Sequence, residues 1–190
     1  MKIKLVNPPV DHYPADILLV YFFSRERPLQ GETGRIDWWL EGHLSRNIMS
    51  GWIRGDFSEK LLSNSARRIA SPRILLNGLG PPEHFTTERY QALVQLIAQA
   101  VAGMGLNKLV TPLPGFHLPS WAPPEITPSL AAELLVEAVA LAFPALPDSF
   151  REPEMLIVAA PDQQDEIFLG AQQVKVNLKG KVDLEVRVGE

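Results

Sequence analysis

The chain of 190 residues contains no cysteine. This absence excludes disulfides, thiolate nucleophiles, zinc–thiolate sites and iron–sulfur clusters, because all of these need the cysteine sulfur. The chain also has little excess charge, since 18 Lys and Arg face 22 Asp and Glu, for a formal net charge of −4. Affinity for the nucleic-acid backbone needs clustered basic residues, so the composition predicts no nucleic-acid partner.

Long apolar runs are missing as well. The N-terminal residues lack an apolar segment of signal-peptide length. The longest apolar runs lie within residues 17–23 and 130–143 and fall well short of the roughly 20 residues of a membrane span. We therefore expect a cytoplasmic protein with no membrane partner. Hydrophobic residues at 46% and charged residues at 21% suit a single globular domain over residues 1–190.

Motifs of catalysis are also absent from the sequence. The four histidines stand apart, with no His-x-x-x-His pair that would place two metal ligands on one helix face. There is no Gly-x-Ser-x-Gly elbow, and Ser45 near His43 is interpreted as a coincidence on a helix surface. We predict no catalytic residue, no metal site and no cofactor, although this leaves the question of enzymatic activity open.

The apolar spacing predicts strands that alternate with helices. Strands are expected at residues 2–6, 17–23, near 61–62, and at 74–76, 109–111 and 155–160, and helices at 36–49, 87–104 and 129–143. Thr86 is a candidate N-cap, and Phe85 and Tyr90 have the spacing of a hydrophobic staple. In the last of these helices we expect an apolar face made of Leu130, Leu134, Leu135, Ala138 and Leu141, with Glu133 and Glu137 on the polar side. Such alternation indicates a largely parallel sheet with helices on both faces.

The C-terminal residues 173–190 show a different pattern. Val174, Val176 and Leu178 alternate with polar residues, and so do the apolar residues between positions 182 and 188. Lys179 and Gly180 stand between these two runs. The alternation predicts a β-hairpin with one apolar face.

An ordered series of segments resembles the N-terminal, non-catalytic domain of the leucyl aminopeptidase family. The series comprises Ile17-Leu18-Leu19-Val20-Tyr21-Phe22, the helix at 36–49, Gly55-Asp56-Phe57, Arg73-Ile74-Leu75-Leu76-Asn77-Gly78-Leu79-Gly80, the helix from Thr87, Leu109-Val110-Thr111-Pro112-Leu113-Pro114, the helix at 129–143 and Met155-Leu156-Ile157-Val158. The resemblance covers residues 16–172. It implies a macro-like, three-layer α/β/α fold with a mixed, largely parallel sheet. The motifs of the family's two-metal catalytic domain do not occur here, so the resemblance implies no catalytic residue.

Two short segments are candidates for binding a small ligand. Asn77, Gly78 and Gly80 follow a buried strand and precede a helix, and in open α/β sheets such turns can hold anions. Macro domains bind ADP-ribose in this general region of the fold. Pro81 and Pro82 remove backbone donors from this turn, and Glu83 adds negative charge. A tight turn that needs glycine dihedrals is therefore the favoured interpretation.

The second candidate is Gly115, Phe116 and His117, followed by Trp121 in a proline-rich loop. Aromatic side chains on a stiff segment can anchor a partner, or they can turn back and cover the end of the sheet. The neighbouring Trp38 and Trp39 leave a similar choice, because adjacent positions of a helix diverge by about 100° and both indoles can hardly face one core.

Three functions are compatible with these observations. The first is a non-catalytic domain that acts by association with itself or with a catalytic aminopeptidase-type subunit, as the hexamers of the resembled family imply. The second is a macro-like module that binds a nucleotide or another small molecule. The third is an enzyme such as an ADP-ribose hydrolase.

Overall fold

The computed structural model describes residues 1–121, 123–143 and 153–189, which form a seven-stranded sheet with helices on both faces. The strands are β1 Lys2–Val6, β2 Ile17–Phe22, β3 Lys60–Asn64, β4 Arg73–Gly78, β5 Lys108–Pro112, β6 Glu154–Val158 and β7 Glu185–Val188. The helices are α1 Gly31–Trp39, α2 His43–Met49, α3 Thr87–Gly103, α4 Pro128–Ala142 and α5 Gln164–Asn177, with 3₁₀ turns η1 Val10–His12, η2 Pro82–His84 and η3 Pro119–Trp121.

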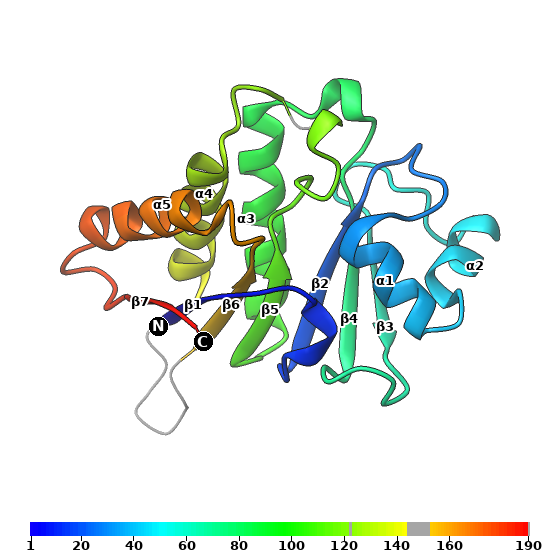
Figure 1. Cartoon of the computed structure of the whole chain (residues 1–190), viewed down its shortest axis with the longest axis horizontal. Coiled ribbons are helices and arrows are strands. Elements are labelled where there is room, and N and C mark those ends of the chain that lie inside the picture. The colour runs from blue at the N-terminus through cyan, green and yellow to red at the C-terminus, as the bar shows by residue number, and fades with distance from the viewer. Residues whose placement is uncertain (122, 144–152, 190) are drawn as a thin grey trace.

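The sheet has the order β3-β4-β2-β5-β6-β1-β7, and its strands are parallel except for the pair β3–β4. Helices α3, α4 and α5 cover one face, and α1 and α2 cover the other (Figure 1). The expected three-layer α/β/α fold with a mixed, largely parallel sheet is confirmed. None of the helices within the described ranges is long and apolar enough to cross a membrane.

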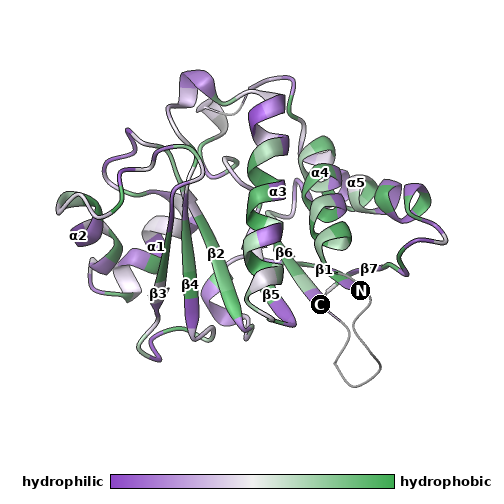
Figure 2. Ribbon diagram, turned by 180° about the vertical axis from the view of Figure 1, so that it is seen from behind, coloured by the Kyte–Doolittle hydropathy of each residue, from purple (hydrophilic) through white to green (hydrophobic). Residues whose placement is uncertain are grey.

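The sequence of strand β2 explains its central position in the sheet. All six of its residues are apolar and buried, and their side chains alternate between the two faces. A strand that is buried on both faces has a continuous apolar run in its sequence instead of an alternation of apolar and polar residues. Figure 2 shows β2 largely in the hydrophobic colour along its length.

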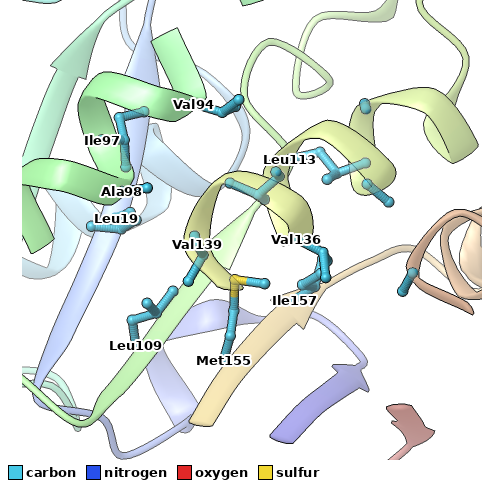
Figure 3. Packing of buried hydrophobic residues seen from close by; sticks show 14 of the residues in the cluster. Leu19, Val94, Ile97, Ala98, Leu109, Leu113, Val136, Val139, Met155 and Ile157 are labelled. Carbon is cyan, nitrogen blue, oxygen red and sulfur yellow. The ribbon is translucent and has the colours of Figure 1, made fainter. Parts of the chain in front are cut away.

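The larger of the two cores lies between the sheet and helices α3, α4 and α5. Figure 3 shows Val136 and Val139 of α4 over the β6 residues Ile157 and Met155, and Ile97 of α3 in the same layer. Dense packing of this kind holds the strands in register, so the loops at their carboxyl ends start from fixed positions.

The ends of α3 and α4 are set by local side chains. Thr86 caps α3 by accepting a hydrogen bond at its hydroxyl from the backbone N–H of Arg89, at 3.4 Å. The rings of Phe85 and Tyr90 meet edge to face at 5.9 Å, which confirms the predicted hydrophobic staple. At α4, the hydroxyl of Thr127 accepts from the backbone N–H of Leu130 at 3.2 Å.

The single helix predicted over residues 36–49 is wrong, because the structure has two helices there. Glu41 and Gly42 take positive φ angles of 54° and 75°, which turn the chain between α1 and α2. The carboxylate of Asp37 then accepts hydrogen bonds from the backbone N–H groups of Leu44 and Ser45 and from the Ser45 hydroxyl. Ser45 therefore serves the start of α2 and makes no hydrogen bond to a histidine among the described residues.

The predicted C-terminal hairpin at residues 173–190 is also wrong. Val174 and Leu178 belong to the buried face of α5 and its C-cap, which they share with Ile167 and Ala171 at helical spacing. Strand β7 does not pair with a neighbouring hairpin strand but lies parallel to β1, with Ile3 opposite Val186. Helix α5 covers the sheet here, so the last residues complete the sheet instead of forming a separate unit.

Candidate functional site

A crevice opens at the carboxyl ends of the strands. The chain leaves β1 and β2 towards the α1 face of the sheet, and it leaves β5 and β6 towards the α4 and α5 face. Loops that diverge in this way open a space between them, and ligands of open α/β sheets bind in such spaces. The crevice has a volume of about 220 Å³ and is lined by Pro8, Gly31, Glu32, Pro112, Leu113, Phe116, His117, Val158, Ala160, Gln163 and Ile167.

His117 is the most firmly held polar side chain of this lining. Its side chain is only 6% exposed, and its Nε2 lies 2.9 Å from an oxygen of Glu26, whose side chain is completely buried. The Glu26 carboxylate also accepts hydrogen bonds from the backbone N–H groups of Phe23 and Gln30. The imidazole ring stacks on the Phe23 ring at 6.0 Å. These contacts fix the ring plane on one wall of the crevice.

The second nitrogen of His117 has no protein partner among the residues that the structure describes. An ionised carboxylate can only accept hydrogen bonds, so the His117 Nε2 is the donor towards Glu26. In the neutral imidazole the Nδ1 atom then carries a lone pair. This Nδ1 makes no hydrogen bond to any residue that the structure describes.

The opposite wall begins at the N-terminus of α1. Gly31 has a φ of +53°, and a Cβ added there would lie 2.8 Å from the Cβ of His117. The next residue, Glu32, accepts a hydrogen bond at Oε2 from the backbone N–H of Val10 at 3.0 Å. The loop that carries His117 therefore rests directly on the first turn of α1.

The first candidate segment, Asn77, Gly78 and Gly80, does not line this crevice. All three residues are buried, and Gly80 donates its N–H to the Gly55 carbonyl at 2.9 Å. A Cβ added to Gly78 would lie 2.2 Å from the carbonyl oxygen of Asp56, so this neighbouring segment covers the turn. The Asn77 amide donates to the carbonyls of Val20 and Leu75 instead of to a ligand.

The second candidate segment is divided between the crevice and the core. Phe116 and His117 line the crevice, whereas Gly115 is buried against the Phe85 ring. Trp121 packs edge to face on Phe23 at 5.3 Å and so turns back over the end of the sheet. Sequence reasoning thus named two lining residues but missed Glu26 and Glu32, which the sequence shows only as isolated acidic positions.

Other polar groups near the sheet end have structural roles. Burial raises the pKa of Tyr21, and the hydrogen bond between its hydroxyl and Thr111 at 2.7 Å works in the opposite direction. Tyr21 therefore stays protonated at neutral pH. In the described part of the chain no three His, Asp or Glu side chains gather as metal ligands would.

A second surface feature lies on the C-terminal part of α1, on α2 and on the turn that follows them, at one end of the molecule (Figure 1). Trp38 is 72% exposed, Met49 83% and Trp52 77%, and Trp39 is 37% exposed. We call these four residues the tryptophan patch. The Trp38 and Trp39 rings meet edge to face at 4.9 Å, beside a groove of about 660 Å³ that also contains Pro28. Large apolar side chains exposed together are typical of interaction surfaces.

The topology, the helix layers and the crevice define a macro-like α/β domain. A macrodomain variant from Oceanobacillus iheyensis, solved with ADPR, superposes with a TM-score of 0.64 at 12% identity and covers 94% of this chain and 93% of its own. The macrodomain of Thermus aquaticus DarG gives a TM-score of 0.57 at 10% identity, covering 83% of this chain and 97% of its own. At such identities the likeness concerns the fold.

The cytosol aminopeptidase family, N-terminal domain, matches residues 17–142, and the chain belongs to this family. A tomato leucine aminopeptidase variant superposes with a TM-score of 0.59 at 15% identity over 88% of this chain. The match covers 34% of the tomato chain, so the present chain corresponds to about a third of that enzyme's length. No curated protein matches the chain. The 190 residues contain no catalytic domain of the family.

Proposed function

We propose that this chain is a non-catalytic association domain of the aminopeptidase type, which binds either a second copy of itself or a catalytic aminopeptidase-type subunit. The observation that carries this proposal is the tryptophan patch. Trp38 and Trp52 are each more than 70% exposed, although tryptophan is a large, mostly apolar side chain. Aromatic residues and Met are enriched at interfaces between proteins, where they lose little conformational freedom on binding. Membership of the aminopeptidase family supports a role next to other chains.

The area of the patch suits such a role. A buried aromatic side chain covers about 150–250 Å². Three indoles of partial exposure and one Met therefore offer about 500 Å², against roughly 800 Å² per partner in a stable interface. The adjoining groove at Pro28 and Leu29 adds further contact surface. The summed apolar area of these four side chains is sufficient for the centre of an interface. We place this association in the cytoplasm, as the composition suggests.

Light scattering across a concentration series tests the self-association arm. We expect a mass above the 21.1 kDa of one chain, falling towards it on dilution. The double variant Trp38→Ser and Trp52→Ser should weaken association at least tenfold. Leu169→Ser is the matched control, because Leu169 is 65% exposed but lies on α5.

Co-purification with a catalytic aminopeptidase chain tests the other arm. Capture by the parent protein and by Leu169→Ser, but not by the double tryptophan variant, is the expected result. A mass of one chain at high concentration, together with no capture of a catalytic chain, would remove the association proposal.

A second candidate function, binding of a small molecule, is favoured by the crevice at the carboxyl ends of β1, β5 and β6. Its position matches the place where open α/β sheets bind ligands. Titration with small molecules of different charge tests this function without reference to the tryptophan patch. Protection of crevice residues on addition of a ligand would support it.

A further inference from the structure

The walls of the crevice restrict the chemistry of what can bind there. Most lining side chains are apolar, among them Leu113, Phe116, Val158 and Ile167. Neither Lys nor Arg occurs among the described lining residues. A ligand that contacts these walls therefore has an apolar body. An anionic ligand would find no Lys or Arg side chain among the described lining residues to pair with.

On these walls the His117 and Glu32 side-chain atoms without partners in the described part of the chain are acceptors, and the Gln163 amide offers both a donor and an acceptor. The Nδ1 of His117 has no hydrogen-bond partner among the described residues, although the side chain is only 6% exposed. The Oε1 of Glu32 likewise has none in the described ranges, since its hydrogen bond to Val10 uses Oε2. Two acceptors on residues that line the same crevice favour a donor on the ligand.

The charges at the two helix N-termini also disfavour an anion. A helix N-terminus carries a partial positive charge that can hold a phosphate or carboxylate. At α1 the Glu32 carboxylate lies in the first turn and already occupies this favourable position. At α5 the first turn carries Asp165 and Glu166. Both helix starts therefore present carboxylates, which attract a cation and repel an anion.

The volume sets the size of the occupant. At about 30 Å³ of liquid volume per water molecule, 220 Å³ corresponds to about seven water-sized groups. Pockets for drug-sized ligands start at about 300 Å³, so the crevice suits a smaller molecule. A nucleotide with its base, ribose and phosphates needs more room than this.

We propose that the crevice binds a small amine, a compound of about six or seven non-hydrogen atoms with a protonated amino group and an apolar body. The ammonium group donates to His117 Nδ1 and to the Glu32 carboxylate, and the apolar body contacts Leu113, Phe116 and Ile167. The buried Glu26 holds the proton of His117 on Nε2 and so leaves the lone pair at Nδ1. This inference rests on the second candidate function and is independent of the association through the tryptophan patch.

Amide NMR titrations with three probes of equal shape test the proposal. The probes are isopentylamine, its neutral isostere isopentanol and its anionic counterpart isovalerate. Isopentylamine should shift the amide signals of Gly31, Glu32 and His117 with a dissociation constant of about 1 mM, a usual value for a ligand of this size. The alcohol and the carboxylate should bind at least tenfold more weakly. Equal binding of the alcohol, tighter binding of the carboxylate, or no shift by the amine would each overturn the proposal.

Variants connect this binding to the named residues. Glu32→Gln keeps an acceptor for the Val10 N–H but removes the charge, and it should weaken isopentylamine binding at least tenfold. Glu166→Gln removes a charge close by without touching the lining, and it should change binding less than twofold. Ala160→Leu adds bulk to the wall and should abolish binding. Unchanged binding in Glu32→Gln and Ala160→Leu would place the amine elsewhere and contradict the proposal.

Discussion

Replacing Ile97 with Ala removes three carbons from the centre of the interface between α3 and the sheet. Ile97 is completely buried, and it lies in the same core as Leu19 of β2 (Figure 3). Three carbons at about 0.8 kcal/mol each give about 2.4 kcal/mol of lost transfer free energy. A residual cavity of about 40 Å³ adds about 1 kcal/mol. We therefore expect Ile97→Ala to lower the free energy of unfolding by about 3.4 kcal/mol, within the usual range of about 2–5 kcal/mol for such changes.

Urea unfolding followed by circular dichroism measures this loss. With a slope of about 3 kcal/mol per molar urea, the midpoint should fall by about 1.1 M. Leu96→Ala is the matched control, because Leu96 is the preceding residue on the same helix and is 39% exposed. We expect its midpoint to fall by less than about 0.3 M, corresponding to less than about 1 kcal/mol. An unchanged midpoint in Ile97→Ala, or equal shifts in the two variants, would show that α3 does not face the sheet as described.

Three further results are expected. Purified protein should release no amino acid from amides or anilides with zinc, manganese or cobalt, since catalytic metals need three or four convergent ligands; metal-dependent release would contradict this. ADP-ribose should bind weakly or not at all by calorimetry, because the crevice of about 220 Å³ is small, and a low micromolar constant would refute the reasoning. Burial raises the pKa of Glu154, but bonds from Lys4 and Lys108 outweigh it and hold the pKa below 4.5. The stability that this carboxylate contributes is present above pH 4.5 and is lost as the pH falls through its lower folded pKa. Glu154→Gln should therefore make the free energy of unfolding depend less on pH in this acid range.

Local signals in the sequence predicted the elements that depend on neighbouring residues. The N-cap Thr86 and the staple of Phe85 with Tyr90 act over three to five residues, so the sequence alone shows them. The apolar run of β2 likewise predicted a strand buried on both faces. Capping and burial on both faces produce residue patterns at short, fixed spacings in the sequence, and the structure confirms these predictions.

Patterns that fit two periods were misread. Val174, Val176 and Leu178 fit a strand over five residues, but the wider set with Ile167 and Ala171 fits a helix. In α4 the difficulty is different, because the helix is apolar on nearly every side. The structure leaves Leu141 57% exposed, whereas the expected stripe placed it in the core. Only Glu133 and Glu137 mark the polar side of α4, so the periodic signal in the sequence is weak.

The pair of Glu26 and His117 could not be predicted from the sequence. The two residues are 91 positions apart and meet only because β2 and β5 are neighbours in the sheet. The sequence did indicate His117 as part of a loop at the end of a strand. Its partner lies in a polar stretch with no periodicity, and only the closure of the sheet buries that carboxylate.

The position of β1 has a consequence for the order in which the molecule can form. This strand lies between β6 and β7, so Ile3 pairs with Met155 and Val186, about 150 and 180 residues further along. The family match, residues 17–142, contains none of these three strands. A ribosome therefore releases β2 to β5 with their helices long before β1 can find either neighbour. Although β1 precedes the other described strands in the sequence, it is therefore among the last of them to be placed in the sheet, and the β5 edge that faces β6 stays unpaired until β6 forms.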